Sequence, residues 1–176
     1  ADGIYGVSKI ISISVKFSEP VIVTGVPYIE LETGVIDRFA YFNNTGNNTN
    51  TLLFTYQVQA GDATEKLDYV GSSSLASASG IKGLTGIPAN VTLVPPGEIG
   101  SIASNNNIKI ETTKLIITGI TTSLPNGVYS SGMTIPLQFS ISRPVLLSDG
   151  QLQITLNSGA ILLINQMNGN QLNADY

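Results

Sequence analysis

The stretch Ile11-Ser12-Ile13-Ser14-Val15-Lys16-Phe17 alternates apolar and polar residues without interruption. In an extended strand, successive side chains point to opposite faces, so the four apolar side chains share one face and the polar ones share the other. This pattern is typical of a half-buried β-strand. It predicts a strand that packs one face on a core and exposes the other face to solvent.

Further segments show the same signs of extended structure. The other expected strands span residues 28–32, 52–58, 90–94, 108–110 and 114–117. Clusters rich in Gly, Pro and Asn separate these strands and favour turns. The one segment with helical character, residues 72–78, is short and rich in Ser. Short strands separated by frequent turns favour an all-β sandwich.

The composition excludes several classes of function. The 176 residues include no Cys and no His, which excludes disulfides, zinc sites of the usual kind and His-dependent catalytic triads. A net charge of −4 argues against nucleic-acid binding. The longest apolar run, residues 160–164, is far shorter than the roughly 18 residues of a membrane span. We therefore expect a soluble molecule, and its first residues do not have the pattern of a signal peptide.

The sequence also matches itself when it is shifted by 124 positions. Gly3-Ile4-Tyr5 then aligns with Gly127-Val128-Tyr129, and Ser18-Glu19-Pro20-Val21 aligns with Ser142-Arg143-Pro144-Val145. The apolar residues of the opening stretch align with Ile135, Leu137, Phe139 and Ile141. After a shorter hairpin, residues 50–56 align with residues 170–176. Matches kept in this order predict a tandem repeat.

The alignment predicts one repeat over residues 1–112 and a partial second repeat over residues 113–176. The first contains 6 Lys+Arg and 10 Asp+Glu, whereas the second has no net charge. The second copy begins with an expected strand over residues 115–120 that has no counterpart in the first copy. The second copy in turn lacks everything that follows Tyr56 in the first. Unpaired strand edges promote association. We therefore expect neighbouring repeats, a second copy or another chain to complete the open edge of the second repeat.

Five phrases of the first repeat occur in a characteristic order. They are Asp2-Gly3-Ile4-Tyr5, Val15-Lys16-Phe17-Ser18-Glu19-Pro20-Val21, Asn50-Thr51-Leu52-Leu53-Phe54-Thr55-Tyr56, Ala60-Gly61-Asp62 and Leu67-Asp68-Tyr69. In this order they resemble the bacterial Ig-like repeats of very large secreted adhesins and cell-surface proteins, the SWM-type repeats. The resemblance covers nearly all of the first repeat and, more weakly, the second. It implies an Ig-like antiparallel β-sandwich that acts as a spacer on the extracellular bacterial surface.

Calcium is the one cofactor that these residues could hold, because it takes oxygen ligands, and the resemblance implies that Ca²⁺ stiffens some arrays. The candidate ligands are Asp2, Glu19, Asp62 and Asp68, in expected loops or at strand ends. They match no EF-hand or nonapeptide calcium pattern, and the alternative is that they are solvated turn residues. The second repeat has Asn126 and Arg143 at the Asp2 and Glu19 positions, which disfavours a site there.

Catalysis without His would require a pair of carboxylates or a Lys or Tyr. Glu30 and Glu32 share one strand face, which is compatible with a glycosidase pair. Ile29 and Leu31 point the other way into the expected core, which leaves both glutamates on the solvent face. We therefore expect no catalytic residues and no enzymatic activity.

Carbohydrate binding is the rival hypothesis for a binding site. Tyr41 and Phe42 lie beside the Asn-rich loop, and the amides of Asn44 and Asn47 could bond to sugar hydroxyls. Phe39 and Tyr41 share one strand face, so core packing is the simpler interpretation of that pair. The sequence thus favours a non-catalytic structural and adhesion module. The alternative is an adhesin tip domain that binds a glycan or a host cell-surface protein.

Overall fold

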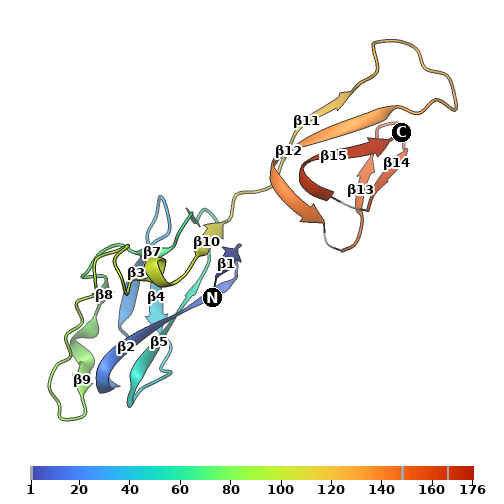
Figure 1. Cartoon of the computed structure of the whole chain (residues 1–176). Coiled ribbons are helices and arrows are strands. Elements are labelled where there is room, and N and C mark those ends of the chain that lie inside the picture. The colour runs from blue at the N-terminus through green and yellow to red at the C-terminus, as the bar shows by residue number, and fades with distance from the viewer. Residues whose placement is uncertain (1, 148, 166) are drawn as a thin grey trace. The chain divides into compact units, whose positions relative to one another are not determined.

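The computed structural model describes residues 2–147, 149–165 and 167–176. The chain divides into two compact units, unit 1 (Ala1–Thr113) and unit 2 (Lys114–Tyr176) (Figure 1). This boundary lies one residue beyond the expected one. Both units are built mainly of strands, and unit 1 also contains the 3-10 helix η1 (Ala78–Gly80) and a short α-helix, so the predicted all-β class is confirmed.

Unit 1 contains two sheets. Its strands are β1 (Gly3–Tyr5), β2 (Ile10–Val23), β3 (Tyr28–Glu32), β4 (Arg38–Phe42), β5 (Thr49–Gln57), β6 (Ala63–Thr64), β7 (Asp68–Tyr69), β8 (Leu75–Ala76), β9 (Ile81–Gly83) and β10 (Ile108–Glu111). The larger sheet has the order β7-β3-β4-β5-β2-β9, with β8 also paired to β3, and the smaller has the order β1-β10-β6. All of these pairs are antiparallel except β1 with β10, which is parallel.

The alternation in β2 determines which of its residues enter the core of unit 1. Ile11 and Ile13 are buried, and the serines between and after them are exposed, as the pattern predicts. Val15 and Phe17 lie on the same face but are only half-buried. The core of unit 1 is therefore open beside the middle of β2.

Unit 2 contains five strands within its described residues. They are β11 (Ile117–Thr122), β12 (Pro136–Leu147), β13 (Leu152–Thr155), β14 (Ile161–Ile164) and β15 (Met167–Asp175). The strands β11-β12-β15 form one antiparallel sheet, and β13 pairs with β14. Phe139 and Leu172 lie opposite each other in the buried cluster between these sheets.

The β2–β5 ladder of unit 1 and the β12–β15 ladder of unit 2 have the same register. Val15 pairs with Leu52, and their aligned counterparts Phe139 and Leu172 pair with each other. Both ladders also shift register at aligned positions, between Lys16 and Val21 in unit 1 and between Ser140 and Val145 in unit 2. Each shift coincides with the aligned proline, Pro20 or Pro144, whose missing N–H cannot join a ladder.

Three local predictions were wrong. Of the strand expected over residues 114–117, only Ile117 lies in a strand, at the start of β11. Residues 90–94, all of which the structure describes, form no strand. Prolines at 88 and 95 bracket this segment, and Thr92 N donates to Asn90 Oδ1 (3.0 Å), a local bond that competes with pairing to another strand. The Ser-rich segment 72–78 contains β8, and only its last residue, Ala78, belongs to a helix, η1. The short helix α1 (Ile102–Asn105) was not predicted; Ser101 caps it by accepting from Ser104 N (3.1 Å).

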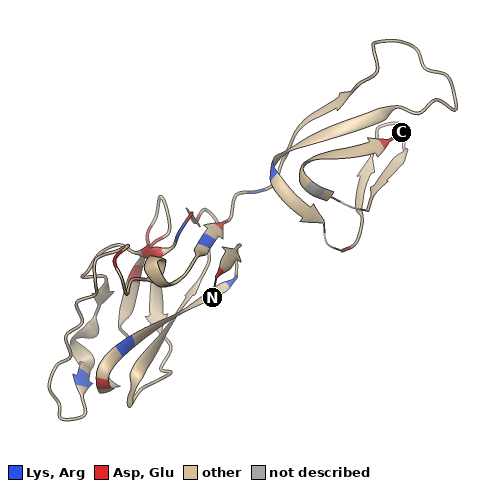
Figure 2. Ribbon diagram, in the orientation of Figure 1, with Lys and Arg blue, Asp and Glu red and all other residues tan. Residues whose placement is uncertain are grey.

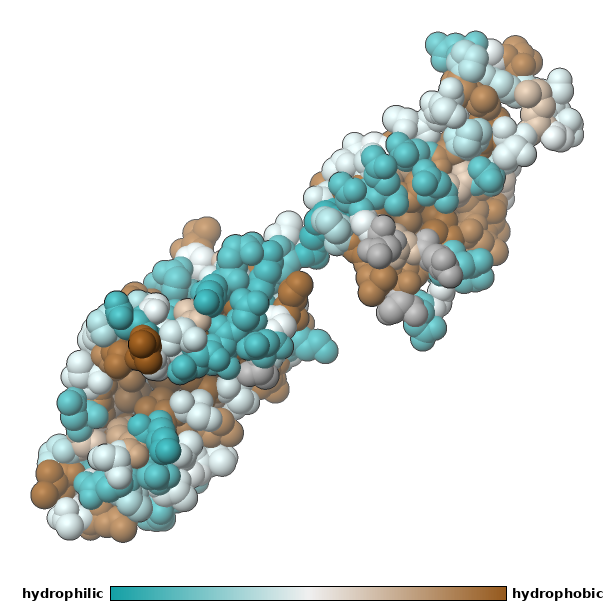
Figure 3. Space-filling model, in the orientation of Figure 1, coloured by the Kyte–Doolittle hydropathy of each residue, from teal (hydrophilic) through white to brown (hydrophobic). Residues whose placement is uncertain are grey.

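Charge and hydropathy differ between the two units. Figure 2 shows many acidic and basic residues on unit 1 and few on unit 2. Figure 3 shows hydrophobic residues reaching the surface of both units among hydrophilic neighbours. Within the described ranges, no helix has the length and apolar character needed to cross a membrane.

Candidate functional site

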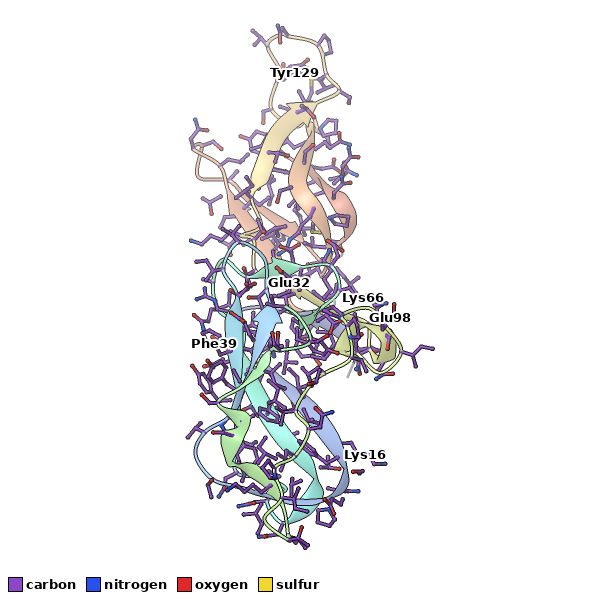
Figure 4. The ribbon with its side chains drawn as sticks, turned by 90° about the vertical axis from the view of Figure 1, so that its left-hand side faces the viewer. Lys16, Glu32, Phe39, Lys66, Glu98 and Tyr129 are labelled. Carbon is purple, nitrogen blue, oxygen red and sulfur yellow. The ribbon has the colours of Figure 1, made fainter. Side chains whose placement is uncertain are left out.

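Three aromatic side chains gather on the outer face of the β3–β4 hairpin. Tyr28 and Tyr41 pair across the strands, and Phe39 follows on β4 two positions from Tyr41. The Tyr28 ring lies 4.9 Å from the Phe39 ring and 6.0 Å from the Tyr41 ring, measured between centroids. Phe39 is 39% exposed and Tyr41 is 50% exposed. We call Tyr28, Phe39 and Tyr41 the aromatic face; Figure 4 shows Phe39 on the outer side of its strand.

The aromatic face corrects two expectations from the sequence. Phe39 and Tyr41 were expected in the core, but Ala40 and Phe42 occupy the core side of β4. Phe42 is only 9% exposed and its ring lies 5.8 Å from that of Phe54, so it does not join a surface platform with Tyr41. Strand alternation alone does not say which of two apolar faces is buried. Tyr28 was not identified from the sequence as a member of this face. The signal was available, because Tyr28 directly precedes the core residue Ile29 in an alternating strand and so points to the opposite face.

The Asn-rich loop after β4 has a mainly structural geometry. Asn44, Gly46 and Asn48 have φ angles of 64°, 91° and 65°, a left-handed conformation that Asn and Gly tolerate best. Asn47 Oδ1 accepts from Val23 N (2.9 Å) and so ties the loop to β2. Of the two predicted amides, Asn44 is exposed, while Asn47 is half-buried and its side-chain oxygen accepts backbone hydrogen bonds.

Asp62 lies at the centre of a buried polar network. Arg38 Nε donates to Asp62 Oδ1 (3.0 Å), Gln59 N donates to Oδ2 (2.7 Å), and the Tyr56 hydroxyl also donates to Oδ2. Asp62 is 2% exposed, so these donors replace the water that a carboxylate needs. Thr112 Oγ1 donates to the Asp62 carbonyl (2.7 Å), which connects the network to the end of unit 1.

The same network affects the acidity of Tyr56. Burial, followed by the hydrogen bond to Asp62 and the charge of that carboxylate, raises the pKa of the Tyr56 hydroxyl well above its ordinary value. Arg38 acts in the opposite direction but more weakly. Tyr56 therefore stays protonated as a hydrogen-bond donor, which suits a structural role.

Asp68 forms a second buried network with backbone donors. Tyr69 N (3.0 Å) and Ile102 N (3.2 Å) donate to its Oδ1, and Gly97 N (2.9 Å) donates to its Oδ2. These bonds hold the segment before α1 against β7. Burial, and secondarily the charge of Asp68, raises the pKa of the neighbouring Tyr69. Tyr69 donates its hydroxyl proton to the Val94 carbonyl (2.6 Å).

The other two candidate calcium ligands lie in different surroundings. Asp2 Oδ1 accepts from Asn107 N (2.8 Å) beside the β1–β10 pair, and Glu19 is an exposed residue of β2 near Gly83. Among the residues that the structure describes, no three acidic side chains form a group that could hold a metal ion. The oxygens of Asp62 and Asp68 are instead bound by protein donors.

The two candidate catalytic glutamates lie on the outer face, as expected from the burial of Ile29 and Leu31. Glu30 pairs across the strands with Phe39, so its side chain projects from the same face of the sheet as the aromatic rings. Glu32 Oε1 accepts from Gly34 N (3.1 Å) in the turn that follows β3. An aromatic surface beside a carboxylate suits the binding of a polar ligand with an apolar face.

A groove opens beside β2 in unit 1. Its volume is about 730 Å³, and its walls include the β2 residues from Ser12 to Glu19 and the segment from Pro88 to Val94. We call it the edge groove. Val15 and Phe17 contribute its apolar floor together with Val91 and Leu93. Lys16, labelled in Figure 4, marks the strand that borders it.

In comparisons with known proteins, no family model, curated protein or solved structure matches this chain.

Proposed function

We propose that this chain is a structural and adhesion module of a large bacterial surface protein, located outside the cell and without catalytic activity. Its two units would be an Ig-like β-sandwich repeat and part of a second one, with neighbouring repeats as their partners. The observation that carries this proposal is the parallel pairing of β1 with β10, the first and last strands of unit 1.

This pairing suits a module that transmits tension. Gly3 pairs with Ile108 and Tyr5 pairs with Ile110, so the start of β1 and the end of β10 lie at opposite ends of the pair. A force between the ends of unit 1 therefore pulls the two strands past each other along their length. All of the hydrogen bonds between them must then resist together instead of opening one at a time.

The strand order gives partial support for the Ig-like assignment. The sequence β2-β5-β4 corresponds to strands B, E and D of an Ig sheet, and β10 beside β6 corresponds to strands G and F. Unit 1 departs from that arrangement because β3, in the position of strand C, pairs with β4 as well as with β7. The shared register of the β2–β5 and β12–β15 ladders supports a common origin of the two units.

Pulling single molecules of the full chain by its ends tests the mechanical role. We expect two unfolding events, with unit 1 resisting the higher force because of its parallel terminal pair. A Gly3→Pro variant removes the hydrogen bond from Gly3 N to Asn107 O (3.0 Å) and should lower that force markedly.

Gly127→Pro is the matched control. Gly127 aligns with Gly3, but the described residues Gly127–Tyr129 form no strand, so the force on unit 1 should not change. Equal unfolding forces for the Gly3→Pro variant and the unmodified chain would contradict the mechanical proposal.

A second candidate function is the binding of a glycan or a host surface protein through the aromatic face. It is favoured by three clustered, partly exposed aromatic rings next to Glu30, because solvent-exposed apolar surface of this kind often marks a binding site. On a glycan array, Tyr41→Ala should abolish reproducible binding. Tyr176→Ala, which removes an equally exposed tyrosine from unit 2, should preserve it. The absence of array binding by the unmodified chain would leave only the protein ligand, to be tested by cell adhesion.

A further inference from the structure

One edge of β2 is unpaired over part of its length. From Ile10 to Lys16 the strand pairs with β5 on one side. On its other side, within the residues that the structure describes, β2 pairs only with β9 and only from Val21 to Val23. The edge groove lies along the unpaired part, from Ser12 to Glu19. Free backbone donors and acceptors at such an edge can pair with an added strand.

In unit 2, the corresponding edge is occupied by β11. Ile120 pairs with Phe139 and Ile117 pairs with Ile141. Phe139 is fully buried and Ile141 nearly so. Their aligned counterparts in unit 1, Val15 and Phe17, are only half-buried and line the edge groove. A strand added over Val15 and Phe17 would bury these two side chains as fully as β11 buries their counterparts.

The strand β11 is itself weakly buried in its own unit. Ile117 remains 53% exposed and Ile120 remains 58% exposed, although both lie in a paired strand. The strand contains no charged residue. It therefore has apolar side chains available for a surface that covers them more completely.

Charge also favours the groove of unit 1. Ser142 N donates to Ile116 O (2.9 Å), so the β11–β12 register continues back to Ile116, and one more step sets Leu115 opposite Arg143, with Lys114 one position further back along the chain. The aligned counterpart of Arg143 in unit 1 is Glu19. The same register in the edge groove would set Leu115 opposite Glu19, so that Lys114 lies one position from an anion instead of one position from another cation.

We infer that the edge groove of unit 1 binds the β11 segment of a second copy of this chain as an added antiparallel strand. In this arrangement Ile120 lies opposite Val15, and Ile117 lies opposite Phe17. The inference rests on the proposed equivalence of the two units. It gives copies of the chain a specific way to join, in addition to covalent linkage in an array.

Disulfide trapping between two full-length variants tests this arrangement, since the chain has no Cys of its own. A Val15→Cys chain and an isotopically labelled Ile120→Cys chain are unfolded together and refolded by dilution with oxidised and reduced glutathione. Oxidised glutathione accepts the two electrons released when the thiols join. The 15–120 product should exceed the out-of-register product of Val15→Cys with Thr121→Cys about tenfold, because a disulfide requires closely spaced Cβ atoms.

A second pair of variants avoids any change in the core. Thr121 pairs with Gln138, whose counterpart in unit 1 is Ser14, and both Ser14 and Thr121 are exposed. Ser14→Cys with Thr121→Cys should therefore also yield a linked product. Three outcomes would each overturn the inference: equal yields for the 15–120 and 15–121 pairs, no linked product, or a product made mainly of two Val15→Cys chains joined to each other through paired β2 edges.

Charge reversal adds a second readout. Leu115→Glu in the Ile120→Cys chain should lower the yield of the 15–120 product, because it sets a second carboxylate opposite Glu19, and Glu19→Lys in the other chain should restore it. A yield that ignores both changes would overturn the proposed register. A failed cross-link would refute this inference but not the equivalence of the two units, which depends on the ladders within each unit. The proposed function is tested separately, by the pulling experiment.

Discussion

Units 1 and 2 share a ladder but differ in what covers it. In unit 1, Ile11 and Ile13 are buried while Val15 and Phe17 are half-buried. In unit 2 the order is reversed. Ile135 and Leu137, the counterparts of Ile11 and Ile13, are half-buried, whereas Phe139 and Ile141 are buried. The alternating pattern of a strand therefore determines which face is apolar, whereas the neighbouring strands determine which residues of that face enter the core.

The units also differ in the size of their cores. Among the described residues, the buried cluster of unit 1 has 19 members and that of unit 2 has six. Because stabilisation by apolar burial increases with the area buried, unit 2 should unfold before unit 1.

The largest effect is expected from truncation of the central phenylalanines. Phe54 and Phe139 are both fully buried. Changing either residue to Ala should lower the free energy of unfolding of the unit that contains it by about 3–5 kcal/mol. In thermal unfolding, Phe139→Ala should remove or lower only the first transition, and Phe54→Ala should lower only the second. Phe39→Ala, at an exposed position of the same hairpin as the core residue Phe42, is the control and should change little. One common transition that shifts with either mutation would contradict independent units.

A smaller effect is expected from Tyr56→Phe. Loss of the hydroxyl removes one donor to the buried Asp62 carboxylate, which keeps its bonds from Arg38 and Gln59. The free energy of unfolding of unit 1 should fall by about 1–3 kcal/mol. The aligned residue in unit 2, Tyr176, is partly exposed, and Tyr176→Phe should change stability by less than about 0.5 kcal/mol. Equal effects of the two changes in denaturant unfolding would show that the Asp62 network contributes no net stability.

Alkaline pH should separate the two variants further. Tyr56 has a raised pKa in the folded state, so its neutral form is favoured there and its contribution to stability is complete below the unfolded value of about 10. Above that pH the unfolded chain loses the proton first, and stability should fall by about 1.4 kcal/mol per pH unit for this tyrosine. Unfolding measured from about pH 9 to about pH 11.5, which brackets that value, should show a shallower decline for Tyr56→Phe. Parallel declines would exclude a raised pKa at Tyr56.

The sequence predicts the strands of this chain better than its surfaces. Alternation predicted β2 and the burial of Ile29 and Leu31, because period-two patterning acts within a single strand. It could not tell that Phe39 and Tyr41 face outward, since β4 is apolar on both faces and the choice depends on packing against Phe54. The buried roles of Asp62 and Asp68 were equally hidden, because their donors come from Arg38, Gly97 and Ile102, far away in sequence.

The smallest effect is expected from calcium, and unit 2 provides the internal control for it. Asp62 and Asp68 already accept hydrogen bonds from protein donors at both carboxylate oxygens, so an ion would have to displace those bonds. A site left to Asp2 and Glu19 would be weak, and an ion at a concentration equal to its dissociation constant adds only about 0.4 kcal/mol. The protein can be melted with a chelator and with about 1 mM Ca²⁺, a concentration in the millimolar range of weak extracellular sites. The unit 1 transition should differ only slightly between these two conditions. The unit 2 transition, with Asn126 and Arg143 at the aligned positions, should not move at all. A rise of several degrees confined to unit 1 would show that carboxylates now engaged within the protein rearrange to bind calcium.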